Sequence, residues 1–178
     1  LSPTLCRTSP YDLRTMELPD PSIFLQRLFA ALEQDGMATA PLVLDHVCYR
    51  VETAERYAAW RDHLSKNGTL LGEHVIGGRP IATFKLHRPF MFQGRAIDVI
   101  ELPAPKHGSP YAEGYEHAEF VVAEDPQVFA ARYPSLNWDL SGAEKKINAD
   151  VRLGYGGFSV KFHERSLEEV IAEENSTK

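Results

Sequence analysis

The segment DHVCYRVE, residues 45–52, decides the fold because its polar and apolar side chains alternate over the length of a β-strand. Every second side chain of a strand lies on the same face. The polar face carries His46, Cys48 and Arg50. The apolar face carries Val47, Tyr49 and Val51. The apolar face is suited to burial, whereas the polar face either meets water or lines a site.

Turn signals and apolar periodicity around this segment predict a repeated order of elements. Asn67-Gly68, Gly77-Gly78 and Gln93-Gly94 separate helical and extended segments. The first half predicts a helix at 22–34, followed by strand, helix and three strands at 43–51, 53–66, 70–76, 79–87 and 96–102. The second half predicts the same order at 115–122, 125–133, 136–140, 147–153 and 157–163, and then a helix at 166–174.

Two related motifs indicate that the halves arose by duplication. Asp45-His46-x-Cys48 corresponds to Glu116-His117-x-Glu119, and 117 minus 46 gives an offset of 71 residues. A supersecondary unit repeated at a fixed offset indicates a duplicated architecture. The sequence therefore predicts an α+β fold of two βαβββ modules that form a cupped mixed sheet. The predicted parts are an N-terminal arm and helix at 1–42, a first module at 43–108, and a second module with the C-terminal helix at 109–178.

Composition favours a small molecule as the partner. The chain has 178 residues, 43% hydrophobic content and a net charge of −6, and no cluster of Lys and Arg runs along any segment. This balance argues against an electrostatic grip on nucleic acid. No apolar run approaches the roughly 18 residues needed to cross a bilayer. We therefore expect no nucleic-acid or membrane partner, and a monomer or weak homodimer.

Cysteine usage indicates a reducing compartment. Cys6 lies in the N-terminal arm and Cys48 in the strand at 43–51, and the chain has no CxxC motif. A disulfide framework and a structural zinc site are therefore not expected. The N-terminus also lacks a basic segment followed by a hydrophobic one, so we expect a cytoplasmic protein.

The polar face of the strands has two interpretations. An antiparallel sheet commonly presents one polar face to water, and this explains strands such as 79–87. His46 and His117 fit a site better, because they lie at matching points of the two halves. Glu101 places a carboxylate within the apolar run VIELP, residues 99–103. Two imidazoles and one carboxylate are a donor set for a divalent transition metal with open positions.

Five ordered segments resemble one known family. They are DHVCYR (45–50), GGRPIATFKLHRPF (77–90), IDVIELPAPK (97–106), GYEHAEFVV (114–122) and VKFHERSLEEVIA (160–172). In this order they resemble the YecM-like metal-binding branch of the vicinal-oxygen-chelate superfamily, which includes glyoxalase I and the extradiol dioxygenases. The likeness covers about residues 22–174 and fails at the N-terminal arm and around 134–150.

The resemblance implies that each module forms half a cup and that the two halves enclose one divalent ion, either Zn, Ni, Mn or Fe. It implies His46, Glu101 and His117 as the ligands. Glyoxalase-like members supply a fourth ligand, often Glu, from the last strand of the second module, where this chain has Lys161 and His163. The remaining set resembles the two-histidine, one-carboxylate arrangement of non-haem iron oxygenases.

Three further polar residues are candidate catalytic groups. Lys161 is suited to binding or polarising an anion, and His163 to ligating the metal, carrying protons near neutral pH or capping the strand end. Glu119 is suited to substrate positioning or charge balance near the metal, or to a buried ion-pair network.

Arg50, Arg79 and Lys85 are candidate substrate-binding residues. Arg79 follows Gly77-Gly78, from where its guanidinium either binds a substrate carboxylate across the mouth of the cup or faces solvent. Arg50 and Lys85 have the alternative of a buried ion-pair network. The other histidines, at 63, 74, 87 and 107, are interpreted as surface or loop residues.

Asp45 and Glu116 directly precede the two predicted histidine ligands. A ligating histidine is usually oriented by a partner on its other ring nitrogen. Adjacent residues of a strand point to opposite faces, so we do not expect Asp45 or Glu116 to serve its own neighbour.

These patterns favour a metal-dependent enzyme of this superfamily that binds a small, oxygen-rich, anionic substrate. Dioxygenase, isomerase and lyase chemistry all remain open, since one fold hosts many reactions. The alternatives are a non-catalytic small-molecule or metal-binding module of the same fold, and a structural protein whose cup is filled by ion pairs.

Overall fold

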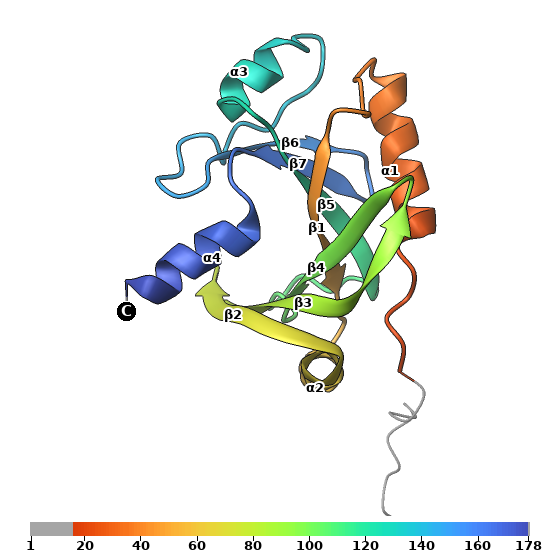
Figure 1. The fold of residues 1–178 in the computed structure, drawn as a ribbon, viewed down its shortest axis with the longest axis vertical. Helices are drawn as coiled ribbons and strands as arrows, with labels where there is room; N and C mark the ends of the chain where they lie inside the picture. Colours follow the sequence, from red (N-terminus) through yellow and green to blue (C-terminus); the bar gives the residue numbers. More distant parts are fainter. Residues whose placement is uncertain (1–15, 178) are drawn as a thin grey trace, which may run out of the picture.

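A seven-stranded sheet in the order β2-β3-β4-β1-β5-β7-β6 organises the chain (Figure 1). The computed structural model describes residues 16–177, so Cys6 and most of the predicted N-terminal arm lie outside the described residues. The strands are β1 Val43–Arg50, β2 Gly68–Ile76, β3 Arg79–Phe92, β4 Arg95–Pro103, β5 Gly114–Val121, β6 Asp150–Gly154 and β7 Ser159–His163. The helices are α1 Ser22–Gln34, α2 Ala54–Asn67, α3 Pro126–Ala131 and α4 Leu167–Ser176.

The two halves of the sheet have matching strand orders when they are read outward from the centre. One side runs β1-β4-β3 and the other β5-β7-β6, and β2 adds a further strand to the first side. β1 and β5 pair antiparallel at the centre, and each has a parallel neighbour, β4 and β7 respectively. β3 and β6 then pair antiparallel with these neighbours. The predicted α+β fold with a cupped mixed sheet is confirmed, whereas the module boundaries at 43–108 and 109–178 stay a prediction.

The second half departs from the expected pattern at 136–140. Only an isolated bridge between Asp139 and Arg152 occurs there, at the place where β2 lies in the first half. Trp138 packs its ring against Phe129 of α3 and Phe162 of β7, and its Nε1 donates to the carbonyl of Tyr133. This apolar segment therefore covers the short helix instead of extending the sheet.

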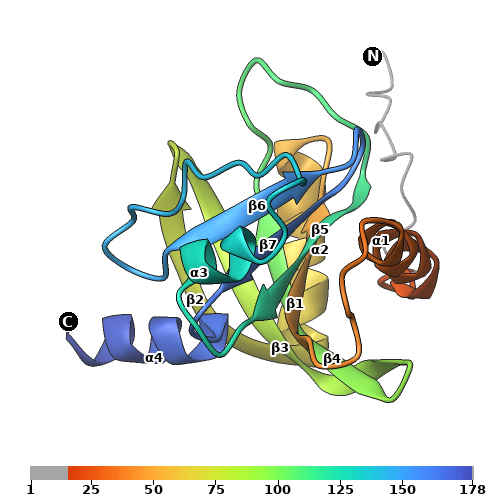
Figure 2. The same cartoon turned by 90° about the horizontal axis from the view of Figure 1, so that it is seen from above.

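The main core lies on the apolar face of the sheet. Phe84, Ile100, Phe120 and Phe162 are fully buried there. The buried stripe of α1 brings Phe29 against Phe120, with ring centroids 5.6 Å apart. Figures 1 and 2 show α1 and α4 on opposite sides of the sheet, so that α4 lies by the face that carries the polar side chains.

Two β-bulges interrupt the pairing of β1 with β5. The pair Leu44–Phe120 is followed by His46–Glu119, which leaves Asp45 as an extra residue on β1. On β5, Glu116 is the extra residue. Cys48 pairs with His117, and the next residue of β1, Tyr49, pairs with Tyr115, so Glu116 has no partner on β1. A bulge breaks the two-residue alternation of side chains and twists the strand locally. Each bulged residue directly precedes a histidine, so the bulges act at the polar face.

Among residues 16–177, every helix is too short or too polar to cross a bilayer.

Candidate metal centre

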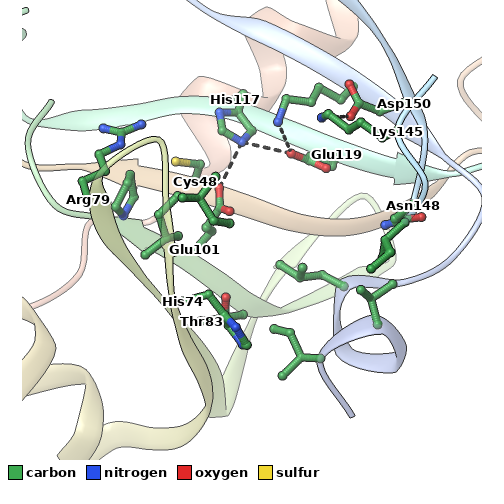
Figure 3. A pocket seen from close by; sticks show the side chains of 18 of the residues that line it. Cys48, His74, Arg79, Thr83, Glu101, His117, Glu119, Lys145, Asn148 and Asp150 are labelled. Carbon is green, nitrogen blue, oxygen red and sulfur yellow. Dashed lines mark hydrogen bonds and ion pairs between the residues drawn. The ribbon is translucent and has the colours of Figure 1, made fainter. Parts of the chain in front are cut away.

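Four side chains bring their donor atoms together at the centre of the sheet. His46 comes from β1, Glu101 from β4, and His117 and Glu119 from β5. One donor atom of each lies within 4.8 Å of the others. The Nε2 atom of His117 is 3.3 Å from Glu101 Oε2 and 3.2 Å from Glu119 Oε1 (Figure 3). The structure thus brings together the three predicted ligands and adds Glu119, which was predicted as a catalytic residue.

Strand pairing explains why these residues meet. Cys48 of β1 pairs with Glu101 on one side and with His117 on the other, while His46 pairs with Glu119. Side chains of directly paired residues lie on the same face at a separation of about 5 Å. The central position of β1 therefore collects donors from three neighbouring strands on the polar face.

The two imidazoles fit a bound cation. His46 Nε2 and His117 Nε2 are buried without a hydrogen-bond partner, among the described residues. The Nδ1 atoms lie 2.8 Å from Asp45 Oδ2 and 2.5 Å from Glu116 Oε2, respectively. A carboxylate that accepts from Nδ1–H fixes the ring and leaves the Nε2 lone pair for a metal. The donor set and its surroundings are therefore suited to holding a divalent metal ion.

The expectation that Asp45 and Glu116 cannot serve their own neighbours is wrong. Both residues are the extra residue of a β-bulge, so the alternation on which that expectation rests fails at these two points. Asp45 also accepts a hydrogen bond from the backbone N–H of Leu167 at 2.9 Å. One carboxylate therefore holds both the ring of His46 and the start of α4.

Carboxylates determine the protonation of the cluster. Burial lowers the pKa of His46, but Glu119 and Asp45 outweigh it and raise that pKa to about 9. Burial also lowers the pKa of His117, but the neighbouring Cys48, Glu101 and Glu116 outweigh it and raise that pKa well above its ordinary value. A ligating histidine must be neutral, so binding of a metal has to displace protons from both rings.

The fourth donor, Glu119, comes from β5 and not from β7, the last strand of the second half. Glu119 pairs with Lys161, as Cys48 pairs with Glu101 in the first half. Lys161 thus takes the place of Glu101, and Glu119 takes the place of Cys48. The Nζ atom of Lys161 donates to Glu119 Oε1 at 2.7 Å. The second half therefore supplies its carboxylate from β5, and the motif Glu116-His117-x-Glu119 contained this signal.

His163 lies behind the cluster instead of in the cavity. Both of its ring nitrogens are buried without a hydrogen-bond partner in the described part of the chain. Its Nε2 lies 3.2 Å from Glu119 Oε2 and 3.6 Å from Asp45 Oδ2. Lys161 and His163 thus contact different oxygens of Glu119, which restricts the rotation of that carboxylate.

A cavity of about 660 Å³ opens over the cluster and contains two of the three predicted substrate-binding residues, Arg50 and Arg79. The guanidinium of Arg50 lies 4.1 Å from the ring centroid of Tyr111. Arg79 Nη1 donates to the Tyr111 hydroxyl at 3.0 Å and to the carbonyl of Ala104. Lys85 does not line the cavity.

Lys85 lies near α4 because it pairs with Val99 and so lies two residues along β3 from Thr83, which pairs with Glu101. Its Nζ atom donates to Glu168 Oε2 at 2.7 Å, and its side chain is 41% exposed. The structure therefore does not bring Lys85 to the clustered donors.

Several cavity residues had no assigned role in the sequence. His74, interpreted as a surface or loop residue, lines the cavity with Nε2 buried and unpartnered in the described region. Arg152 reaches the cavity because it pairs with Lys161 across β6 and β7. Lys145 and Asp150 line it as an ion pair (Figure 3). Strand alternation puts Asp150 and Arg152 on one face of β6, but their distance from the candidate ligands depends on the pairing of that strand.

The comparison with known families decides the affiliation of the chain. The family model described as YecM protein matches residues 15–153, a range that contains all four clustered donors. The chain belongs to the YecM family. This confirms the resemblance to the YecM family, whereas membership of the vicinal-oxygen-chelate superfamily stays a prediction. Lys161 and His163 lie beyond the range matched by the YecM model.

Known proteins resemble this YecM family member over different lengths. Protein YecM of Escherichia coli (strain K12) is 35% identical over 182 residues, which cover 90% of this chain and 95% of that protein. An uncharacterized protein of Haemophilus influenzae (strain ATCC 51907 / DSM 11121 / KW20 / Rd) is 30% identical over 103 residues, or 58% of this chain and 54% of its own. The solved structure of structural-genomics protein EC4020 has a TM-score of 0.73 at 29% identity, covering 94% of this chain and 99% of that one.

Proposed function

We propose that this YecM family member holds one divalent metal ion on His46, Glu101, His117 and Glu119. We further propose that it is a metal-dependent enzyme of the vicinal-oxygen-chelate superfamily that acts on a small, oxygen-rich anion. The observation that carries the proposal is a pair of buried imidazoles. Their Nδ1 atoms are anchored, and their Nε2 atoms face carboxylate oxygens without forming a hydrogen bond in the described structure.

Two imidazole nitrogens and two carboxylate oxygens suit Zn, Ni, Mn or Fe. When bound, such an ion supplies Lewis-acid polarisation of two vicinal oxygens of the substrate. Glu119 extends the three-donor set that the sequence predicted. Lys161 and His163 act as positioning residues in this proposal, because each contacts one oxygen of Glu119.

The charge of the cavity supports an anionic substrate. The cavity is lined by the carboxylates of Glu101, Glu116, Glu119, Asp150 and Glu174. It is also lined by the cationic groups of Arg50, Arg79, Lys145, Arg152 and Lys161. These formal charges cancel, so a divalent cation leaves the site positive. Opposite charge raises the local concentration of an anion in a cleft.

A non-catalytic binding module is the second candidate. It is favoured by the engagement of cationic groups that line the cavity, since Lys161 contacts Glu119 and Arg79 contacts Tyr111. A residue that is already held by an internal partner is less suited to moving protons. Metal binding without turnover of any small 2-oxo acid or catechol would favour this candidate over the enzyme.

The metal content of the purified protein tests the proposal. Protein prepared without chelator and reconstituted separately with Fe, Mn, Ni and Zn is expected to hold about one ion per chain for at least one metal. His46→Ala, Glu101→Gln and His117→Ala are expected to hold less than roughly a tenth of that amount, as measured by plasma mass spectrometry. His87→Ala is the matched control, since this histidine does not line the cavity. Equal, near-zero contents in all proteins would remove the basis of the proposal.

The bulged carboxylates give a separate prediction. Asp45→Asn and Glu116→Gln are each expected to lower the affinity for Zn²⁺ by about 10- to 100-fold, because an uncharged amide oxygen replaces the carboxylate that accepts from each Nδ1–H and raises the basicity of the ring. Competition with a chromogenic chelator measures the change. Asp62→Asn is the control, because among the described contacts the Asp62 carboxylate pairs only with Lys66, in an exposed turn of α2. This variant should retain full affinity for Zn²⁺. An unchanged affinity in both bulge variants would contradict the orienting role.

A further inference from the structure

The cavity over the candidate metal centre combines charged side chains with aliphatic ones. Five aliphatic residues that line it and are at least partly exposed define what we call the apolar rim: Val75, Ile76, Ile81, Ile147 and Leu167. They come from the β2–β3 hairpin, the loop before β6, and α4. Three segments that are distant in sequence thus place aliphatic side chains in the lining of one cavity.

Three members of the rim are largely exposed. Val75 exposes 76% of its surface, and Ile76 and Ile147 each expose 57%. Single exposed aliphatic residues are common on proteins, but apolar residues that gather around one concave opening mark a binding site. Ile76 pairs with Arg79 at the end of the hairpin, so its side chain lies on the same face as a group that lines the cavity.

We propose that the apolar rim binds the hydrocarbon part of the substrate, so that the ligand is an amphipathic acid. Such a molecule carries vicinal oxygens and negative charge at one end, and an alkyl or aryl group at the other. This inference rests on the proposed function and names the class of substrate for that same site. The charged end meets the metal and Lys161, and the hydrocarbon end meets Ile76 and Ile147.

The size of the cavity agrees with this class. Small-molecule sites have volumes of about 300–1,000 Å³. A volume of about 660 Å³ exceeds what an ion and a two-oxygen chelate fill. Charged groups interrupt the rim, since Lys145, Arg79 and Glu174 line the same opening. A mouth of this mixed character suits a small ligand better than a flat protein surface.

A pair of hydroxamates tests the inference with Zn²⁺-loaded protein. Acetohydroxamate and octanohydroxamate chelate a metal through the same two oxygens and differ only in their alkyl tails. Each methylene removed from water contributes about fourfold in affinity, so octanohydroxamate is expected to bind at least about tenfold more tightly. Isothermal titration of each compound into the loaded protein gives the ratio of the two dissociation constants.

Exposed rim residues provide the variants. The double variant Ile76→Ser, Ile147→Ser is expected to reduce the ratio to less than about threefold and to leave acetohydroxamate binding unchanged. Val128→Ser is the matched control, because Val128 is 55% exposed and lies outside the cavity lining. It should keep the full ratio. Thermal melting checks that all three proteins fold, which is expected because the side chains replaced are more than half exposed.

The outcomes separate the inference from the proposed function. A ratio near one in the unmodified protein, with both compounds bound, overturns the apolar rim and leaves the metal centre standing. Failure to bind Zn²⁺ overturns the proposed function and the inference together. A change in sedimentation of the double variant without a change in the ratio also overturns the inference, because the rim would then be a self-association surface.

Discussion

Glu119→Gln is expected to lower the affinity for Zn²⁺ by more than about 100-fold, beyond the effect of losing an outer hydrogen-bond partner. The substitution keeps the shape of the side chain but removes its negative charge. Glu119 Oε1 lies 3.2 Å from His117 Nε2 and 3.5 Å from His46 Nε2, so it shares the position to which both imidazoles point. Competition titration with a chelator, at a pH fixed for all proteins, measures the loss.

The matched control for Glu119→Gln is Glu113→Gln. Glu113 is also a largely buried carboxylate, but it accepts hydrogen bonds from Arg56, Trp60 and Tyr49 instead of facing an imidazole. This variant is expected to lose stability and keep full affinity for Zn²⁺. If Glu119→Gln stayed within about threefold of the unmodified protein while His117→Ala lost the metal, the three-donor set predicted from the sequence would be the right one.

The sequence is enough to group the candidate donors where strand alternation alone decides. Beyond the bulge at Asp45, His46 and Cys48 share one face of β1, and Cys48 pairs with both Glu101 and His117. The 71-residue offset relates the two histidines. The meeting of the donors follows from β1 lying between β4 and β5. Side-chain alternation and duplication are patterns of the sequence itself, so they can be recognised in a single sequence.

The prediction failed where the result depends on a partner strand. The bulges at Asp45 and Glu116 exist because β1 and β5 contribute unequal numbers of residues between successive pairs, and neither site has a glycine that would mark it. Lys85 shares a face of β3 with the cavity residue Thr83, but it pairs with Val99 instead of Glu101 and its ammonium contacts Glu168. The segment 136–140 has alternating residues, yet Trp138 packs against α3 and leaves one bridge. Register and packing partners are thus the missing information.

Phe162→Ala is expected to destabilise the protein by about 3–5 kcal/mol, the usual cost of removing a fully buried phenylalanine ring. Phe162 is completely buried on β7, where its ring lies 4.8 Å from Phe129 and 5.7 Å from Phe120. Urea unfolding measures the change. Ile23→Ala, at a position that is 75% exposed, is the control and should stay within about 0.5 kcal/mol. A loss below about 1 kcal/mol for Phe162→Ala would contradict the packing of β7.

This variant also separates the core from the metal centre. Phe162 lies on the face opposite to its neighbours Lys161 and His163, which hold the two oxygens of Glu119. If the four donors are intact in the folded variant, Zn²⁺ at about 100 times its dissociation constant should restore about 2.7 kcal/mol, because the ion binds only the folded state. Glu119→Gln should gain much less from the same Zn²⁺ concentration. The stabilisation by Zn²⁺ therefore depends on the donors of the polar face, whereas the loss in Phe162→Ala arises from the core behind them.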